Sequence, residues 1–364
     1  MKKNKNNSKL SGKNTGQEEK AMEALFKWVT KTGSFRPKIG KAVLKSGYFA
    51  NVLDLGNNFG LAISADGVGT KMLVAEMMNK YDTIGIDCIA MNVNDIICVG
   101  AEPISMLDYL AVQKTDPKVF GEIGKGLYEG AKLSRINIPG GEVAQIKEMI
   151  KGYKDDSGVD IAGTCIGTVP INKIIIGQDL SEDDVIIGIR SSGIHSNGLT
   201  LARNVLFNKM KFKHNKYFPE LKRTLGEELL EPTHIYVAPV MDILRSKINV
   251  KSLANITGDG LLNITRVAKK GLSFVVEYLP ELHPIFHMIK KCGNIPEEEM
   301  YKTFNMSVGF CITVANKDKN KCLNVLKKHK LDAFAMGYIV KDREQKVIIE
   351  PANLIGKNNR FYKI

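Results

Sequence analysis

Residues 64–71 read SADGVGTK, and a largely apolar stretch at 82–99 follows them closely. Residues 61–65 are apolar and end at Asp66-Gly67, which predicts a strand that stops at a glycine turn. The stretch 82–99 predicts a helix, because Asp82 can cap its start and Gly100 can end it. A strand, a turn and helices in this order are typical of α/β proteins.

The alternation of strands and helices continues along the chain. Pro170 and the polar run at 178–184 interrupt it, so we expect two α/β domains, at 21–172 and 173–364, behind a basic, disordered tail at 1–20. The fold class is therefore mixed α/β. Further strands are expected at 104–112, 136–138, 159–169, 184–189, 308–314 and 347–349, and further helices at 18–30, 70–80, 117–134, 199–208, 231–244, 284–291 and 296–300.

The composition indicates a soluble cytoplasmic protein. Of its 364 residues, 44% are hydrophobic and 25% charged, and no apolar run has the roughly 18–20 residues that span a membrane. The six cysteines form no CxxC pair, as expected of reduced core residues. The net charge is +13, but the tail contributes part of it and the rest is spread along the chain. We therefore expect an anionic small-molecule substrate rather than nucleic acid as the primary partner, and no membrane.

The helix expected at 82–99 carries a polar stripe on an otherwise apolar surface. Asp87, Met91, Asn94 and Asp95 lie at i, i+4, i+7 and i+8 and so share one face. Asp66 adds a third carboxylate at the end of the preceding strand. Oxygen ligands of this kind suit Mg²⁺, with phosphate oxygens completing its shell. Three interpretations stay open: a magnesium site, pairing with lysines, or acids at a solvated helix edge.

Two glycine turns are candidates for nucleotide binding. Gly67-Val68-Gly69-Thr70-Lys71 lacks the Walker A spacing, but it follows a strand and opens a helix, so it could hold phosphate. The alternative is a plain turn followed by a surface lysine. Gly140-Gly141-Glu142 ends a short strand, and Glu142 could reach a metal or nucleotide or could simply be solvated.

Residues 191–198, SSGIHSNG, form a polar loop between a strand and a helix. Three hydroxyls, an amide, an imidazole and two glycines before a helix N-terminus suit a monoester phosphate. His195 could be a general base, a phosphate donor or a structural residue. Asp259, in the later turn TGDG at 257–260, is expected to cap a helix that runs to about residue 269.

Taken together, these segments resemble the phosphoribosylformylglycinamidine cyclo-ligases, also called aminoimidazole ribonucleotide synthetases. The resemblance follows the family's order over roughly residues 35–350. It rests on DGVGTK at 66–71, residues 82–103, LDY at 107–109, GGE at 140–142, SSGIHSNG at 191–198, LLEPTHIYVAPV at 229–240, ITGDG at 256–260 and EMYKTFNMSVG at 299–309.

The resemblance implies a ligase of purine biosynthesis that forms a C–N bond. Such enzymes use ATP and Mg²⁺ to close formylglycinamidine ribonucleotide to 5-aminoimidazole ribonucleotide, releasing ADP and phosphate. It also implies a homodimer in which the N-terminal halves join their sheets. The implied roles are catalysis by Asp95, His195 and Lys71; metal binding by Asp66, Asp95 and Glu142; nucleotide binding by Asp66, Gly67, Gly69, Thr70, Lys71, Asp87, Asn94, Gly140, Gly141 and Glu142; and substrate binding by Ser192, Gly193, His195, Ser196 and Asn197.

The sequence also departs from the family pattern. SGYFANVL at 46–53 replaces a glycine-rich loop, Gln145 stands where an acid is frequent, Asn255 replaces a histidine, and Asp259 places a carboxylate in an anion-binding turn. These changes leave two alternatives open. One is a thiamine-monophosphate kinase-like enzyme, and the other is a nucleotide-binding member of the same superfamily without catalytic activity.

Overall fold

The computed structural model describes residues 15–364. Of the tail expected at 1–20, residues 1–14 lie outside the described part of the chain. Residues 15–20 correct that expectation, because they begin a helix, α2 (Thr15–Val29), which the 3₁₀ helix η1 (Thr30–Phe35) follows. Within the described part of the chain, no helix is long and apolar enough to cross a membrane.

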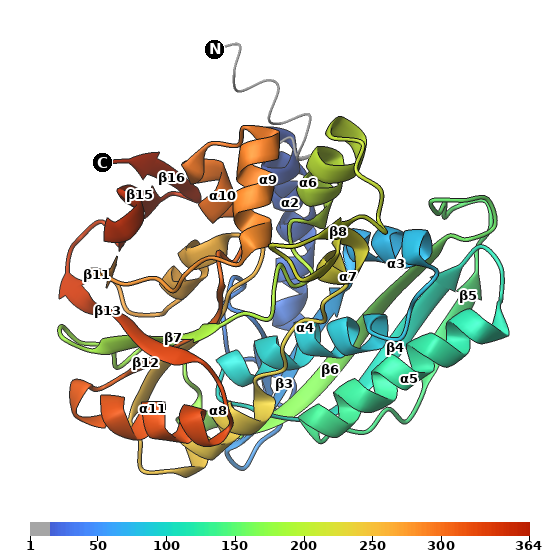
Figure 1. Cartoon of the computed structure of the whole chain (residues 1–364). Coiled ribbons are helices and arrows are strands. Elements are labelled where there is room, and N and C mark those ends of the chain that lie inside the picture. Colours follow the sequence, from blue (N-terminus) through green and yellow to red (C-terminus); the bar gives the residue numbers. More distant parts are fainter. Residues whose placement is uncertain (1–14) are drawn as a thin grey trace.

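The N-terminal half is a six-stranded sheet with helices on one face (Figure 1). Its order is β1-β2-β3-β6-β4-β5, and every neighbouring pair is antiparallel except β4 and β5. The strands are β1 (Lys41–Ala42), β2 (Asn51–Asp54), β3 (Phe59–Gly67), β4 (Glu102–Val112), β5 (Gly141–Gln145) and β6 (Val159–Pro170), and the helices are η2 (Gly69–Lys71), α3 (Met72–Met78), α4 (Ile84–Cys98) and α5 (Pro117–Ser134).

The two faces of this sheet differ sharply. Side chains of β3 and β6 that point toward α4, such as Ala62 and Cys165, are fully buried. The opposite face, which we call the outer face, exposes large apolar side chains to between 41% and 51%. These are Phe59, Ile104, Leu107 and Tyr109.

Helices α4 and α5 pack through glycine. A Cβ on Gly85 would lie 2.1 Å from the backbone nitrogen of Leu127, so no side chain fits there. We expect Gly85→Ala to cost about 1–3 kcal/mol of stability through overpacking. Gly124→Ala is the matched control, because that exposed position of α5 is open and alanine favours a helix by up to about 1 kcal/mol. In thermal unfolding, Gly124→Ala should have the highest midpoint, the wild type an intermediate one and Gly85→Ala the lowest. Equal midpoints would contradict this packing.

The C-terminal half is built on an eight-stranded sheet of order β10-β12-β7-β13-β11-β14-β15-β16. Its strands are β7 (Val185–Arg190), β10 (Val250–Asn255), β11 (Leu272–Val276), β12 (Val308–Val314), β13 (Ala333–Lys341), β14 (Val347–Ile349), β15 (Leu354–Lys357) and β16 (Arg360–Lys363). The helices are η3 (Ile171–Lys173), α6 (Leu199–Arg203), η4 (Asn204–Lys209), α7 (Leu225–Leu229), α8 (Val237–Arg245), η5 (Gly260–Thr265), α9 (Pro284–Gly293), α10 (Glu297–Thr303), η6 (Asn316–Asp318), α11 (Lys319–Lys328) and η7 (Glu350–Ala352), and β8 (Tyr217–Phe218) and β9 (Arg223–Thr224) form a hairpin.

Three expected elements need correction. The strand expected at 136–138 is a single bridge from Asn137 to Ser105. The helix expected at 231–244 begins only at Val237, because Pro232 disfavours helical backbone in the residue before it. The helix expected after Asp259 is the single 3₁₀ turn η5.

Helix α4 joins the two halves. It contacts β3 and β6 of the first sheet on one side and β10 and α8 of the second half on the other, and Figure 1 shows it near the centre of the molecule. Thirteen of its fifteen residues are buried. Asp87, Met91 and Asn94 of the polar stripe are therefore enclosed at the junction between the halves, while Asp95 is partly exposed.

Candidate active site

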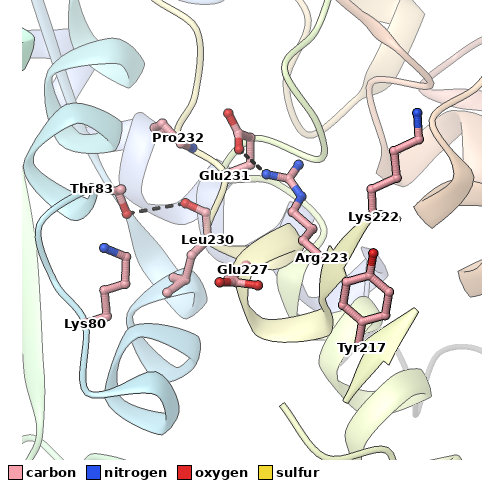
Figure 2. A pocket seen from close by; sticks show the side chains of 9 residues that line it. All are labelled: Lys80, Thr83, Tyr217, Lys222, Arg223, Glu227, Leu230, Glu231 and Pro232. Carbon is pink, nitrogen blue, oxygen red and sulfur yellow. Dashed lines mark hydrogen bonds and ion pairs between the residues drawn. The ribbon is translucent and has the colours of Figure 1, made fainter. Parts of the chain in front are cut away.

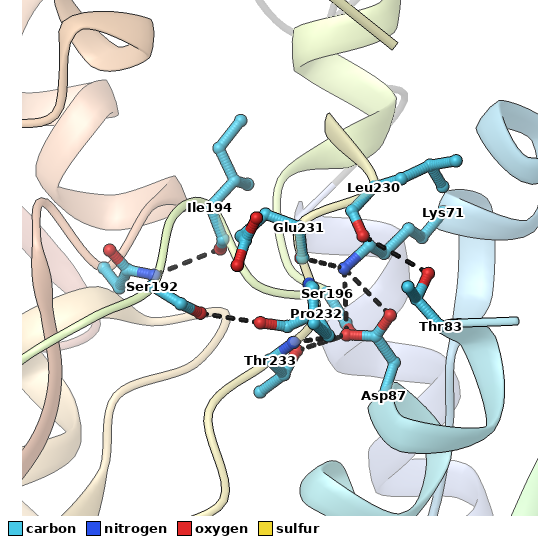
Figure 3. A network of polar contacts seen from close by, with 11 residues as sticks. Lys71, Thr83, Asp87, Ser192, Ile194, Ser196, Leu230, Glu231, Pro232 and Thr233 are labelled. Carbon is cyan, nitrogen blue, oxygen red and sulfur yellow. Dashed lines mark hydrogen bonds and ion pairs between the residues drawn. The ribbon is translucent and has the colours of Figure 1, made fainter. Parts of the chain in front are cut away.

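A buried ion pair lies at the centre of the junction (Figure 3). The Lys71 ammonium is 2.9 Å from Asp87 Oδ1 and 2.8 Å from Oδ2, and both side chains are fully buried. Lys71 also donates to the Glu231 carbonyl at 2.5 Å. Asp87 Oδ1 accepts from the Thr233 amide at 2.7 Å and hydroxyl at 2.6 Å, and from the Ser196 hydroxyl at 3.2 Å. We call these five residues the junction network.

Asn94 makes a second tie between the halves. Its amide nitrogen donates to the His234 carbonyl at 2.9 Å, and its oxygen accepts from the Tyr236 amide at 3.0 Å. Asp87 and Asn94 therefore hold the extended segment 231–236 in place. The family resemblance implies that Asp87 and Asn94 bind the nucleotide, but their polar atoms bond to protein groups here. Of the interpretations left open for Asp87, pairing with a lysine is the one that the structure shows.

Asp95, from the same stripe, has a different environment. Its Oδ1 accepts from the Asn255 amide at 2.9 Å. Burial raises the pKa of Asp95 to about 7, and the charge of Asp66 adds to the increase, while Asn255 and Arg266 oppose it. Two carboxylates thus lie within electrostatic reach of each other without a full counter-charge, which is an arrangement that favours a bound cation.

Asp66 is held in place by α4. Its backbone nitrogen donates to Asn92 Oδ1 at 3.0 Å, and its carbonyl accepts from Asn92 Nδ2 at 3.1 Å. Its carboxylate accepts from the Gly67 amide at 2.7 Å, and burial raises its pKa. The sequence reading did not identify Asn92, although an asparagine between apolar neighbours on a buried helix was the available signal.

The strand register separates Glu142 from Asp66. Asp66, Gly163, Asp108 and Gly141 are paired in one row across β3, β6, β4 and β5. Glu142 falls in the next row, where side chains alternate to the outer face, and it is exposed. Within one protomer the structure therefore does not bring the expected trio of Asp66, Asp95 and Glu142 together.

Asp108 is the acid that the sequence reading missed. It occupies the row of Asp66, and burial raises its pKa. Its carboxylate lies against Gly141, where a Cβ would come within 2.5 Å of Oδ1, so the glycine turn makes room for this acid. Among residues 15–364, no group of three or more His, Cys, Asp or Glu side chains could hold a metal ion by itself.

The loop at 191–198 is tied down by its own hydroxyls. Ser192 Oγ donates to the Pro232 carbonyl at 2.6 Å, and Ser191 Oγ to the Gly193 carbonyl at 2.9 Å. Asn305 Nδ2 donates to the Gly193 and Ile194 carbonyls. The rigid loop leaves Asn197 half-buried beside the turn at Gly258, where a Cβ would lie 3.1 Å from the Asn197 amide oxygen.

His195 is buried within this loop in a left-handed conformation, with φ of 66°. Its Nε2 accepts from the Ser192 amide at 3.2 Å. Burial lowers the pKa of His195 well below its usual value, and the charges of Lys71, His234 and His283 add to the decrease. The ring is therefore neutral at pH 7 with Nε2 occupied, and the structural interpretation of His195 fits it better than that of a base or a cationic phosphate donor.

In the turn at 67–71, some residues are engaged with other parts of the protein and others are exposed. Lys71 belongs to the junction network, and Thr70 Oγ1 lies 2.9 Å from Thr200 Oγ1 in α6. Gly69 has φ of 67° and stays exposed, with open space where a Cβ would stand. The lysine is therefore not a surface residue, and in this conformation it is not presented to a phosphate.

The departures from the family pattern have physical explanations. Asp259 pairs with Arg266 at 3.0 Å and with Lys302 at 3.4 Å. Although burial opposes them, these two cations hold the pKa of Asp259 below its usual value. Its charge is thus compensated within the turn. Asn255 contacts Asp95, and Gln145 is exposed at the end of β5.

A cavity of about 450 Å³ opens beside the junction network (Figure 2). It shares Glu231 with the network, and Lys80, Lys222 and Arg223 contribute positive charge. Arg223 is paired with Glu228 at 2.6 Å and with Glu231, so most of this charge is already compensated. We assign no ligand to this cavity.

Comparisons with known proteins agree with this arrangement. Residues 47–169 match the sequence model of the AIR synthase related protein, N-terminal domain, and residues 181–350 match that of the C-terminal domain. The chain is 45% identical over 339 residues to a phosphoribosylformylglycinamidine cyclo-ligase of Methanocaldococcus jannaschii, covering 92% of this chain and 93% of that protein. It is 46% identical to the enzyme of the same name from Pyrococcus horikoshii, covering 90% and 92%.

Solved structures with the same fold are more distant in sequence. A complex of AaThiL with AMPPCP and TMP superposes with a TM-score of 0.57 at 15% identity, covering 88% of this chain and 91% of that chain. This similarity concerns the fold alone.

Proposed function

Because this chain belongs to the AIR synthase related proteins and carries their N- and C-terminal domains in order, we propose that it is a phosphoribosylformylglycinamidine cyclo-ligase. It would use ATP to close formylglycinamidine ribonucleotide to 5-aminoimidazole ribonucleotide, with release of ADP and phosphate. One observation carries the proposal. Asp66 and Asp95 of the N-terminal half lie within electrostatic reach of each other, and Asp95 contacts Asn255, at the end of β10 in the C-terminal half.

The donor set at this place fits Mg²⁺ that also binds a nucleotide. Magnesium is usually held by one or two carboxylates and completes its octahedron with phosphate oxygens and water. Asp66 and Asp95 supply two carboxylates whose mutual repulsion a divalent cation would relieve. Asp108 faces the same side of the sheet as Asp66 and is a further candidate. When bound, MgATP supplies the phosphoryl group that turns the formyl amide oxygen into a leaving group.

The chain's own residues then position the substrate. The junction network and Asn94 fix segment 231–236 and loop 191–198 against α4. We propose that this loop lines the ribonucleotide site, with Asn197 and the backbone at Ser192, Gly193 and Ser196 facing the substrate. A fixed loop lowers the entropic cost of bringing the amidine nitrogen to the activated carbon.

We also propose that the chain acts as a homodimer through the outer face. Four large, partly exposed apolar side chains on one sheet surface form an apolar patch, and such patches often mark sites of protein–protein contact. Glu142 lies on that face and not with Asp66, so its contribution to a metal site would depend on the second protomer.

A turnover assay tests the activity. Purified chain with formylglycinamidine ribonucleotide and MgATP should form an aminoimidazole product, with one ADP for each ring closed. Phosphorylation of thiamine monophosphate instead would support the kinase alternative. Nucleotide binding without either product would support the alternative of a member without catalytic activity.

A further inference from the structure

The N-terminal arm of the described chain, residues 15–43, exposes an apolar surface of its own. Met22, Leu25, Phe26 and Val29 recur at i, i+3, i+4 and i+7 of α2, so they form one stripe. They are 42–54% exposed. Each residue at 21–39 is exposed, and Phe35 and Ile39 reach 76% and 64%. An amphipathic helix has formed here, and the residues at 15–364 leave about half of its apolar stripe exposed.

A helix of this size is not stable alone. Isolated helices of about 12–15 residues are marginal in water, and most helices in proteins are stabilised by packing of their apolar face. Within the chain, the main contact of α2 is η1, which directly follows it. Within the described residues, the protomer therefore leaves the apolar stripe of this helix largely uncovered.

The arm is continuous with the outer face. It leads through η1 and β1 into β2 and β3, at the edge of the six-stranded sheet. Exposed apolar side chains continue along the same path, from Phe35 and Ile39 through Val43 to Phe59. The arm thus leads along the chain directly into the strands that carry the outer face.

From these observations we propose that α2 and η1 form a dimerisation arm that packs against the second copy of this chain. The inference rests on the homodimer proposed above. If a large side chain exposes about 200 Å² when free, the outer face offers roughly 370 Å² of apolar area and the arm roughly 850 Å². Obligate homodimers bury about 1,000–2,500 Å² per partner, of which about 65% is apolar. The outer face with the arm reaches this range, whereas the outer face alone does not.

The charges of the arm favour a protein partner over a lipid surface. Helices that lie on membranes carry mainly Lys and Arg on their polar face. The polar face of α2 carries Lys20, Glu23 and Lys27, which is a mixed set with little attraction for anionic lipids. A second copy, whose matching surface is already apolar, is the better complement.

The single tryptophan of the chain, Trp28, lies in the arm and is 66% exposed in the protomer, so it reports directly on docking. We expect its emission in the full chain to shift to longer wavelength on dilution, in step with dimer dissociation followed by sedimentation. Leu25→Glu with Phe26→Glu should raise the dimer dissociation constant about tenfold or more. Lys20→Glu with Lys27→Glu, on the polar face, should change it less than about twofold and serves as the folding control.

Any of three results would overturn the proposal. The variant Leu25→Glu with Phe26→Glu could form a dimer of unchanged affinity. The Trp28 emission could stay the same when the chain associates, or it could shift only when phosphatidylserine vesicles are added. A dimer that behaves as expected but lacks cyclo-ligase turnover would support the arm and contradict the proposed function. Turnover by a chain that stays monomeric would support the proposed function and contradict the dimerisation arm.

Discussion

Replacing Asp87 by alanine should lower the free energy of unfolding by about 3–5 kcal/mol, because it leaves the Lys71 ammonium buried without a counter-charge. The same change removes the acceptor for the amide and hydroxyl of Thr233 and for the hydroxyl of Ser196. Since Thr233 and Ser196 belong to the C-terminal half, the loss should appear as earlier separation of the two halves. Thermal and urea unfolding, followed by circular dichroism, measure the effect.

The matched control is the exposed pair of Lys341 and Glu182, whose side chains are 76% and 44% accessible. Because solvent screens such pairs, Glu182→Ala should leave the unfolding midpoint essentially unchanged. Equal effects of Asp87→Ala and Glu182→Ala would show that the junction network does not stabilise the chain.

A double variant separates the two roles considered for Lys71. Lys71→Met with Asp87→Asn removes both charges but keeps a side-chain oxygen that can accept from Thr233 and Ser196, so it should restore stability that removing one charge alone takes away. If Lys71 only ties the halves together, turnover should recover along with the unfolding midpoint. Recovery of the midpoint without turnover would mean that Lys71 also reaches the nucleotide, as the sequence resemblance implies.

Local sequence signals predicted the local structure well. The helix expected at 117–134 is α5 (Pro117–Ser134), because Asp116 caps it and its apolar residues keep the helical period. Asp116 Oδ1 accepts hydrogen bonds from the amides of Lys118 and Val119, which follow it by two and three residues. Where the forces are this local, sequence spacing is sufficient.

The site depended on contacts that no local pattern encodes. Spacing placed Asp87 and Asp95 on one face of α4, but their partners, Thr233 and Asn255, are 146 and 160 residues away. One acid is neutralised by a lysine and the other is not, which only the tertiary structure decides. The difference between Asp108 and Glu142 is one of strand register, since a shift of one residue moves a side chain to the other face.

Replacing Asp95 by asparagine should lower turnover by about 10²–10³-fold while the fold stays intact. Asparagine has the same shape and keeps an oxygen that can accept from Asn255 Nδ2, so the contact between the halves survives. What is lost is a negative charge beside Asp66, where the proposed metal and the transferring phosphoryl group would require it. Because Asp95 is only partly exposed, water replaces that charge poorly.

The assay is steady-state turnover with MgATP, together with the unfolding midpoint of each variant. Asp242→Asn is the control, since it removes one carboxylate from the exposed surface of α8, where Asp242 meets His329. Glu142→Gln extends the comparison to the outer face: a loss as large as that of Asp95→Asn would return Glu142 to the metal site, through the second protomer. Unchanged turnover in Asp95→Asn would remove Asp95 from the catalytic group, and with it the reason for placing magnesium at this junction.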